Sequence, residues 1–398
     1  MFRSIKALLF TVVCLLTTVS AIAQSITSPS GIIGASGERV ITTGVPFLSI
    51  TPDARSGGMG DAGVAISPDA NATYWNPAKL AFLETELGVA GSFTPWLAKV
   101  VNDMSISYLS GYKKLNEDQA LALSMTYFDL GDIQLTDNQG NLLNLVSPRE
   151  FSLAATYSLK FSQNFSGGLN LKFIHSNLFA GTTSGSGAGD GRPGISAGAD
   201  VSVFYTKDAV IGGKESNFSL GAVISNIGPK ISYLDEDQAD FLPTNLRLGG
   251  AYTTSLDPFN TLTFALDVNK LMVPTPDTTR NLGDIGLLSG MFGSFADAPD
   301  GFSEELREFT ISAGLEYWYN NLFAVRGGYY YEAQDKGDRR YFTAGIGLRY
   351  QVFGVDFAYL VPQGVRNDLG IASNPLAETL RVTIQFNLDQ DLEEVPER

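Results

Sequence analysis

Cysteine and histidine are almost absent from this sequence. Its 398 residues contain one cysteine and one histidine. The cysteine, Cys14, lies in an N-terminal leader that we expect to be removed, so the mature chain would form no disulfide bond and offer no thiol nucleophile. A catalytic triad or a metal site would have to use His175, which we interpret as a structural residue at the end of a strand. We therefore expect no catalytic residue, no metal site and no cofactor.

Positive charge is also scarce. The chain carries 27 Lys and Arg residues against 42 Asp and Glu residues, which gives a net charge of −15. Loss of the leader removes Arg3 and Lys6 and no acidic residue, so the net charge of the mature chain becomes −17. Nucleic-acid binding needs a basic surface, because the partner is a polyanion. Nucleic acid is therefore excluded as a partner.

Long hydrophobic runs are missing after the leader. Residues 1–23 have the pattern of a signal peptide, with a basic start, an apolar stretch over residues 7–19 and the cleavage motif Ala21-Ile22-Ala23. No later stretch approaches the 18 or more apolar residues of a spanning helix. An exported, glycine-rich chain of this kind is either a secreted all-β protein or an outer-membrane β-barrel.

About fourteen segments alternate between apolar and polar side chains, as strands with one apolar face do. They cover residues 84–93, 103–112, 119–130, 150–161, 165–176, 197–206, 217–225, 245–254, 260–270, 308–318, 321–332, 340–351, 353–361 and 379–387. Most are about ten residues long, enough to cross a bilayer at a tilt, and their even number suits a closed barrel. The predicted fold class is all-β, a transmembrane barrel of about fourteen strands over residues 84–388.

The connections between these segments alternate between long and short. This asymmetry favours an outer-membrane barrel over a soluble sandwich, because such barrels have tight turns on the periplasmic side and long loops outside. Residues 207–216 are the exception, a moderately long turn expected on the short side. We expect a multi-pass protein of the outer membrane, with both termini in the periplasm and an acidic tail at residues 389–398.

Residues 24–83 precede the strands and lack their alternation. Fourteen strands enclose a lumen too wide for wall side chains to fill, so we interpret residues 24–83 as a lead-in followed by a lumen plug. Gly58–Gly63 matches a dinucleotide-binding pattern, but no βαβ unit accompanies it, and tight backbone packing is the better interpretation. The predicted plug motif consists of Arg55, Gly57, Gly58, Gly60, Asp61, Trp75, Asn76, Pro77 and Ala78.

These motifs carry a family resemblance. Asn76-Pro77-Ala78, after a Gly/Asp-rich segment and before fourteen strands, resembles FadL-type outer-membrane transporters. Within that superfamily, the stretches Val45–Leu48, Pro52–Asp61 and Trp75–Lys79 are similar to the PorV (LptO) family of the type IX secretion system. The resemblance implies a protein that is not an enzyme. It implies that the protein binds secreted cargo with C-terminal signal domains after the cargo has passed through a Sov/SprA-type translocon. The protein would then deliver this cargo to a PorU-type sortase attachment complex. Outer-membrane lipid would surround the barrel.

The external loops are the expected place for cargo. The longest connection, residues 271–307, is too apolar for a bare loop and suggests a folded lid or a contact surface. Its candidate partner or cargo contacts are Leu287, Met291, Phe292 and Phe295, and residues 226–243 are a second candidate loop. The alternative function is a FadL-like channel for uptake of hydrophobic small molecules.

Overall fold

The computed structural model describes residues 39–97, 103–136, 141–178, 192–233, 239–276, 284–363 and 379–388. These residues belong to one compact unit, residues 39–398. The expected signal peptide, the start of the lead-in and the acidic tail lie outside the described residues.

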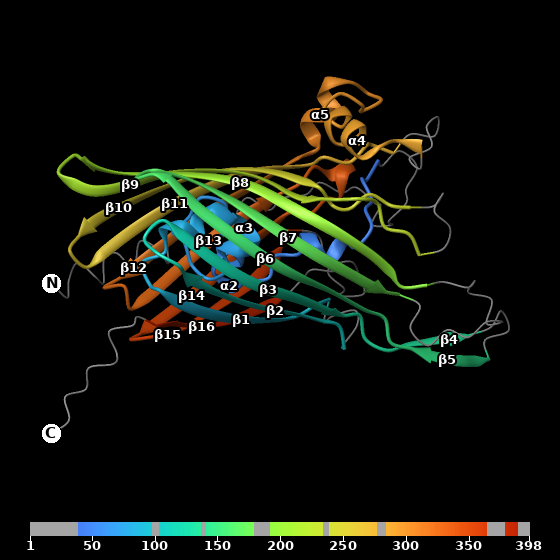
Figure 1. Ribbon diagram of the computed structural model, residues 1–398, viewed down its shortest axis with the longest axis horizontal. Coiled ribbons are helices and arrows are strands. Elements are labelled where there is room, and N and C mark those ends of the chain that lie inside the picture. The colour runs from blue at the N-terminus through green and yellow to red at the C-terminus, as the bar shows by residue number, and fades with distance from the viewer. Residues whose placement is uncertain are drawn as a thin grey trace. The chain divides into compact units, whose positions relative to one another are not determined.

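Fourteen antiparallel strands form a closed barrel (Figure 1), which confirms the predicted fold class. In chain order the barrel strands are β1 (Leu87–Pro95), β2 (Ser105–Lys114), β3 (Gln119–Asp129), β6 (Arg149–Ser162), β7 (Phe165–Asn177), β8 (Gly194–Ile211), β9 (Lys214–Ile227), β10 (Asn245–Asp257), β11 (Asn260–Leu271), β12 (Phe309–Tyr319), β13 (Phe323–Tyr331), β14 (Tyr341–Tyr350), β15 (Phe353–Pro362) and β16 (Leu380–Leu388). Each strand pairs with its neighbour in this order, and β1 pairs with β16, where Leu87 lies opposite Leu388.

Side chains alternate between the two faces of the wall, because successive residues of a strand point to opposite sides. On β14, Phe342, Ile346 and Leu348 are exposed on the outside, while Tyr341 and Thr343 are buried inside. An apolar outer face and a polar inner face are typical of a transmembrane barrel. Among the described residues, no helix is long and apolar enough to cross a membrane.

Short turns gather at one end of the barrel and long connections at the other. The prediction of a moderately long turn at residues 207–216 was wrong. Strands β8 and β9 continue through this stretch and are joined by Gly212-Gly213, whose φ angles of 61° and 79° suit a two-residue hairpin turn. Lys207, Asp208, Lys214 and Glu215 interrupt the apolar alternation near the tip of this hairpin, so the pattern used to find strands stops before the strands do.

Three of the long connections contain folded elements. The connection between β3 and β6 forms a hairpin of β4 (Ile133–Thr136) and β5 (Leu142–Val146), which the sequence analysis did not predict. The connection between β11 and β12 contains helices α4 (Leu287–Gly293) and α5 (Phe302–Arg307), and the one between β13 and β14 contains the 3-10 helix η6 (Gln334–Lys336).

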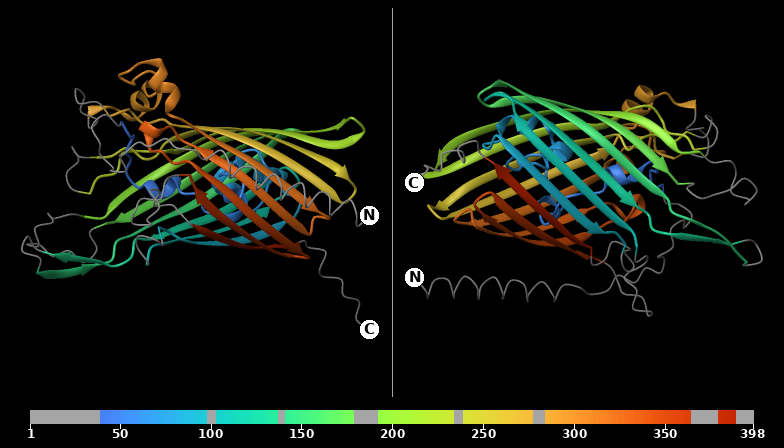
Figure 2. Two further views of the ribbon diagram at one scale, coloured as in Figure 1. Left: turned by 180° about the vertical axis from the view of Figure 1, so that it is seen from behind. Right: turned by 60° about the horizontal axis from the view of Figure 1, so that its bottom comes forward.

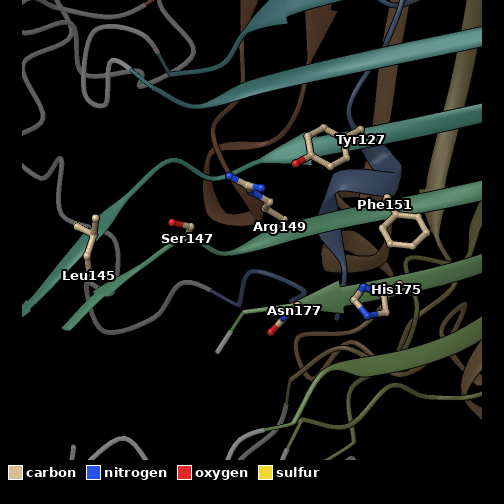
Figure 3. Close-up of a pocket in the computed structure, with 7 residues that line it drawn as sticks. All are labelled: Tyr127, Leu145, Ser147, Arg149, Phe151, His175 and Asn177. Atoms are coloured by element: carbon tan, nitrogen blue, oxygen red, sulfur yellow. The ribbon is translucent and has the colours of Figure 1, made fainter. Parts of the chain in front are cut away.

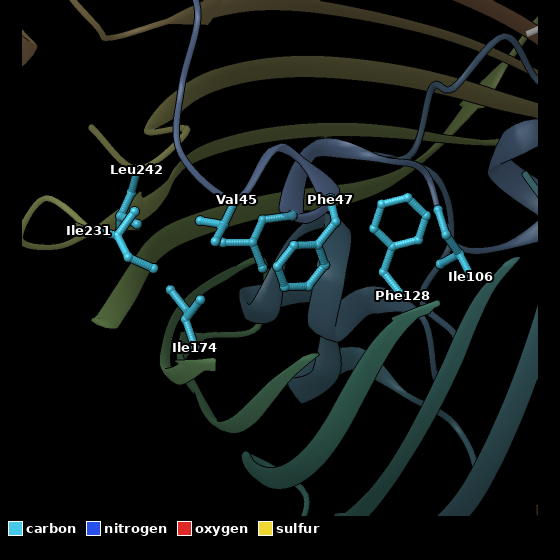
Figure 4. Packing of buried hydrophobic residues seen from close by; sticks show 8 residues of the cluster. Val45, Phe47, Ile106, Phe128, Ile174, Ile231 and Leu242 are labelled. Atoms are coloured by element: carbon cyan, nitrogen blue, oxygen red, sulfur yellow. The ribbon is translucent and has the colours of Figure 1, made fainter. Parts of the chain in front are cut away.

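Residues 45–83, here called the lumen segment, are surrounded by the barrel strands (Figure 2). The segment consists of short helices linked by turns: η2 (Pro46–Ser49), α2 (Ala54–Gly57), α3 (Ala72–Trp75) and η3 (Pro77–Phe82). At the long-loop end, Val45 and Phe47 pack in an apolar cluster with residues of the wall and of the loop after β9 (Figure 4). The cluster consists of Val45, Phe47, Leu48, Ile106, Phe128, Ile174, Ile231 and Leu242.

Candidate functional site

Arg55 links the lumen segment to the barrel wall through charge. Its Nε and Nη2 donate to the two carboxylate oxygens of Glu316 on β12, at 3.0 and 2.9 Å. Glu316 also accepts from Arg326 of β13 at 2.7 Å, and Arg326 donates in turn to Asp356 of β15 at 2.7 Å. All four side chains are buried. The pairing neutralises charges that would otherwise be costly away from bulk water.

The predicted glycines allow backbone to pack directly on backbone. Gly60 has φ +70°, and a Cβ added there would lie 2.5 Å from the amide nitrogen of Tyr329 on β13. Gly58 faces Gly345 of β14, where a Cβ on either residue would lie 3.1 Å from the other Cα. Glycines therefore stand on both sides of the contact, and residues 58–60 approach the wall more closely than any side chain permits.

Asp61 completes the first half of the motif. It accepts from the Tyr341 hydroxyl at 2.5 Å and from Arg381 Nη1 at 3.1 Å. The guanidinium of Arg381 also packs against Gly57, where an added Cβ would lie 2.7 Å from Nη1. The motif residues 55–61 thus contact strands from β12 to β16.

The Trp-Asn-Pro-Ala stretch contacts a different part of the ring. Asn76 donates to the carbonyl oxygens of Val64 and Val203, both at 3.1 Å. The Ala78 amide donates to the Ser202 hydroxyl at 3.0 Å, and the Ala78 carbonyl accepts from Ser166 at 2.6 Å. These wall residues belong to β7 and β8, so the two halves of the motif hold the segment to well-separated strands.

Trp75 and Pro77 fix the local shape of the segment. The indole Nε1 of Trp75 donates to Asp53 at 2.6 Å, within the segment itself. Pro77 begins η3 and packs over Gly168 of β7, where a Cβ would lie 2.6 Å from the Pro77 carbonyl carbon. The structure therefore brings all nine predicted motif residues into contact with the wall or with one another. Whether the segment closes the lumen to solutes stays a prediction.

A second candidate site lies at the long-loop end. Residues 284–308, here called the cap, include α4 and α5 and rest on a buried ion-pair cluster. Glu308 accepts from Lys270 of β11 at 2.5 Å and from Lys336 of η6 at 2.9 Å. Glu304 accepts from Lys336 at 2.7 Å and from Arg39 at 2.8 Å. Lys270, Glu304, Glu308 and Lys336 are all buried. Because these buried ion pairs join the cap to the barrel, the cap has a fixed position and is not a bare loop.

The cap presents apolar side chains to solvent. Phe292 is 63% exposed and Phe302 is 76% exposed, while Met291 is 2% exposed. The exposed set consists of Leu288, Phe292, Phe295, Phe302 and Leu306. Met291 was predicted as a partner contact, but in this structure it packs inward beside Gly290, which faces Phe241. Leu287 is half-buried. Phe302 and Leu306 were not predicted, although their spacing of four residues places them on one helical face.

Acid is expected to loosen the cap. Burial raises the pKa of Glu304, but hydrogen bonds from Lys336 and the Asp300 amide, with the charges of Lys336 and Arg39, outweigh burial and hold it below the usual 4.5. A carboxyl with a depressed pKa in the folded state stabilises that state above its unfolded pKa, and the contribution disappears as the pH falls through the folded value. The protection factors of residues 287–307, which correct hydrogen-exchange rates for the intrinsic effect of pH, should therefore fall below about pH 4.5.

The Glu304→Gln variant provides the control for this pH effect. It should exchange faster than wild type at neutral pH and should respond less to acid, because the titrating group is gone. The same acid response in both proteins would contradict the assignment to Glu304.

The described residues contain no group of three or more His, Cys, Asp or Glu residues placed to hold a metal ion. Gly194–Gly198 fits the G-x-S-x-G pattern but lies within strand β8, and not at a strand-to-helix turn. Ser196 is buried and donates to the Pro229 carbonyl at 3.0 Å, whereas His175 belongs to the outward-facing residues of β7. The two side chains therefore do not meet.

Comparison with known proteins gives a family match. The model described as "Type IX secretion system protein PorV" matches residues 34–278, more than half of the chain. No protein of curated function matches in sequence.

Similar solved structures include two toluene transporters and a FadL homologue. The Pseudomonas putida toluene transporter TodX has a TM-score of 0.46 and 12% identity, over 85% of this chain and 99% of that one. The Ralstonia pickettii toluene transporter TbuX has a TM-score of 0.44 and 11% identity, over 84% and 98%. A Pseudomonas aeruginosa FadL homologue has a TM-score of 0.45 and 11% identity, over 88% and 100%. The fold assignment above rests on the strand pairing and not on these likenesses.

Proposed function

Because this chain belongs to the PorV family of type IX secretion system proteins, we propose that it binds secreted cargo with C-terminal signal domains after translocation and shuttles it to the cell-surface attachment complex. A Sov/SprA-type translocon would deliver the cargo, and a PorU-type sortase complex would receive it. The protein would act without catalysis, as a binding module in the outer membrane. The long-loop end would face the outside of the cell.

The exposed apolar face of the cap is the observation that carries this proposal. Leu288 and Phe292 are four residues apart around α4, and Phe302 and Leu306 are four residues apart at α5, so each helix presents an apolar pair. Exposed aromatic and aliphatic side chains on a rigid support are typical of protein contact sites. The buried ion pairs below supply that support.

The lumen segment favours a receptor over a channel. Its contacts occupy Glu316, Asp267, Ser202 and Thr383, which are inward-facing polar groups on separate strands. A conduction path along the barrel would have to break or bypass these contacts. Residues 24–83 are accordingly proposed as a lead-in and plug. The barrel begins and ends at the short-turn end, where Leu87 pairs with Leu388, and we place this end and the C-terminus in the periplasm. Arg39, the first described residue, pairs with Glu304 of the cap at the long-loop end, so the predicted periplasmic location of the N-terminus does not follow from the strand ends.

Loss of the apolar face should weaken cargo binding without disturbing the barrel. In the double variant Phe292→Ser and Phe302→Ser, two exposed aromatic anchors are removed, and the affinity for a purified cargo signal domain should fall at least tenfold. Biolayer interferometry in detergent would measure the change. Leu115→Ser is the control, because Leu115 is an exposed leucine in a turn at the opposite end. Equal binding by both variants and wild type would remove the cap from the proposal.

A gentle detergent pull-down distinguishes the proposed function from a channel for hydrophobic small molecules. The proposed role in secretion predicts that a giant translocon barrel or a sortase co-purifies with the protein. It also predicts that cargo is no longer secreted when the gene is deleted. A channel predicts neither, and instead predicts reduced uptake of fatty acids or hydrocarbons in the deletion strain. Normal secretion in that strain would sink the secretion proposal.

A further inference from the structure

A pocket of about 630 Å³ lies on the outside of the barrel wall, and Leu145 of the β4–β5 hairpin is one of its lining residues (Figure 3). Its lining includes two neighbouring rows of side chains that run across strands β3, β6 and β7. Tyr127, Phe151 and His175 are directly paired across these strands, and Arg149 pairs with Asn177 one level further toward the loops. The Phe151 and His175 rings stack at 5.0 Å with an angle of 22°.

This pocket faces the membrane and not the lumen. Its residues alternate with Glu150 and Ser176, which are buried and face inward. Further along the same outward rows, Leu153 is 47% exposed and Phe173 is 43% exposed, as lipid-facing side chains are. The change from these apolar residues to Arg149 and Asn177 marks the level where the hydrocarbon region ends and headgroups begin.

Arg149 supplies positive charge at this level. Its side chain is 55% exposed, and its Nε lies 3.9 Å from Oδ2 of Asp129, at the outer limit of an ion pair. The Nδ1 atom of His175 is buried and has no hydrogen-bond partner among the described residues. A guanidinium at a lipid-facing level is costly unless an anion meets it, and phosphate is the anion for which its planar donors are best suited.

The apolar surroundings of the pocket indicate that the anion belongs to a lipid. Leu145 of the hairpin lines the pocket, and Ile133, Leu142 and Leu145 are 45%, 73% and 55% exposed. Leu153 and Phe173 lie on the hydrocarbon side of Arg149 and can contact acyl chains, which a free phosphate ion does not have.

We propose that this pocket binds the phosphate-bearing headgroup of a membrane lipid. Arg149 binds the phosphate, Asn177 and Tyr127 offer further hydrogen-bond donors, and the acyl chains lie along Leu153 and Phe173. This site lies outside the wall, so it is independent of cargo binding at the cap.

Native mass spectrometry of the full-length protein in detergent tests the proposal. We expect one dioleoyl phosphatidic acid to bind more tightly than dioleoylglycerol, which has the same chains and no phosphate. Arg149→Gln should lower the affinity for phosphatidic acid roughly tenfold, because it removes a charge-assisted hydrogen bond. Asp129→Asn should raise it, because the competing carboxylate is lost. Arg340→Gln, at the same end but paired with Asp338 at 2.6 Å, should leave it unchanged.

Three outcomes would overturn the proposal. Equal affinity for dioleoylglycerol would show an apolar groove without phosphate recognition. Full competition by excess inorganic phosphate would show a site for the free ion. Unchanged binding by Arg149→Gln, with the folded barrel verified by its heat-dependent gel mobility, would place the lipid elsewhere or show a site that serves another protein.

Discussion

A valine at position 328 is expected to expel the lumen segment and to raise the ion conductance of the barrel. A Cβ on Gly328 would lie well inside contact distance of the Gly60 nitrogen and the Met59 carbonyl carbon. These are backbone atoms and cannot rotate away. The segment is held nearby by the Gly60 amide, which donates to Thr343 at 2.8 Å. Overpacking of this kind costs about 1–3 kcal/mol or more for one site.

Position 327 offers a matched control for this experiment. A Cβ on Gly327 would meet its nearest neighbour, the Thr343 carbonyl oxygen, at 3.9 Å, which is ordinary contact. Gly327→Val should therefore keep the segment in place. Planar-bilayer recordings would measure conductance, and limited proteolysis would detect release of residues 45–83. If Gly328→Val neither conducts nor becomes protease-sensitive, the segment is not what closes the lumen.

Replacing Glu316 with glutamine is expected to cause the largest loss of stability among single charge changes in the lumen. Both Arg55 and Arg326 depend on this carboxylate, and all three side chains are buried. Breaking a buried ion pair by removing one partner costs about 3–5 kcal/mol. Arg55 keeps its ion pair with Asp69 and Arg326 keeps its ion pair with Asp356, so the expected loss lies at the lower end of this range. The unfolding temperature should fall, and protease should reach residues 45–83 more readily.

A double variant separates the energy of the Arg55–Glu316 ion pair from the other effects of each substitution on stability. Arg55→Met combined with Glu316→Gln should lose less stability than the sum of the two single changes, since residues in one network are not additive. Glu215→Gln is the control for loss of a strand glutamate, because Glu215 is exposed near the tip of β9. Strict additivity of the two changes would contradict the pairing of Arg55 with Glu316.

The barrel strands could be predicted because their signal is local. On β14 the alternation of Phe342, Ile346 and Leu348 with inward residues is visible in ten consecutive positions. The ends of β8 and β9 could not be found in this way, because beyond the hydrocarbon region a strand needs no apolar face. The β4–β5 hairpin was missed for a similar reason, since its short strands do not cross the membrane.

The candidate sites were predictable only in part. Glu316 and Asp267 lie on the polar faces of alternating segments, but a local pattern cannot show that their partners are Arg55 and the Gly63 amide, more than 200 residues away in sequence. In α4 the apolar content indicated a contact surface. It could not show that Met291 is buried while Phe292 is exposed, because the orientation of α4 depends on the close approach of Gly290 to Phe241 of another loop.

The pairing of β1 with β16 sets an order for assembly. The ring is completed only when residues 380–388 reach residues 87–93, about 300 positions earlier in the chain. The lumen segment precedes every barrel strand in the chain, so it can already lie between the strands when the ring closes. The segment can therefore act as a template: α2 gathers late strands and η3 gathers early ones. A variant that releases the segment from the wall should therefore slow barrel formation, and the barrel that forms should have an open lumen.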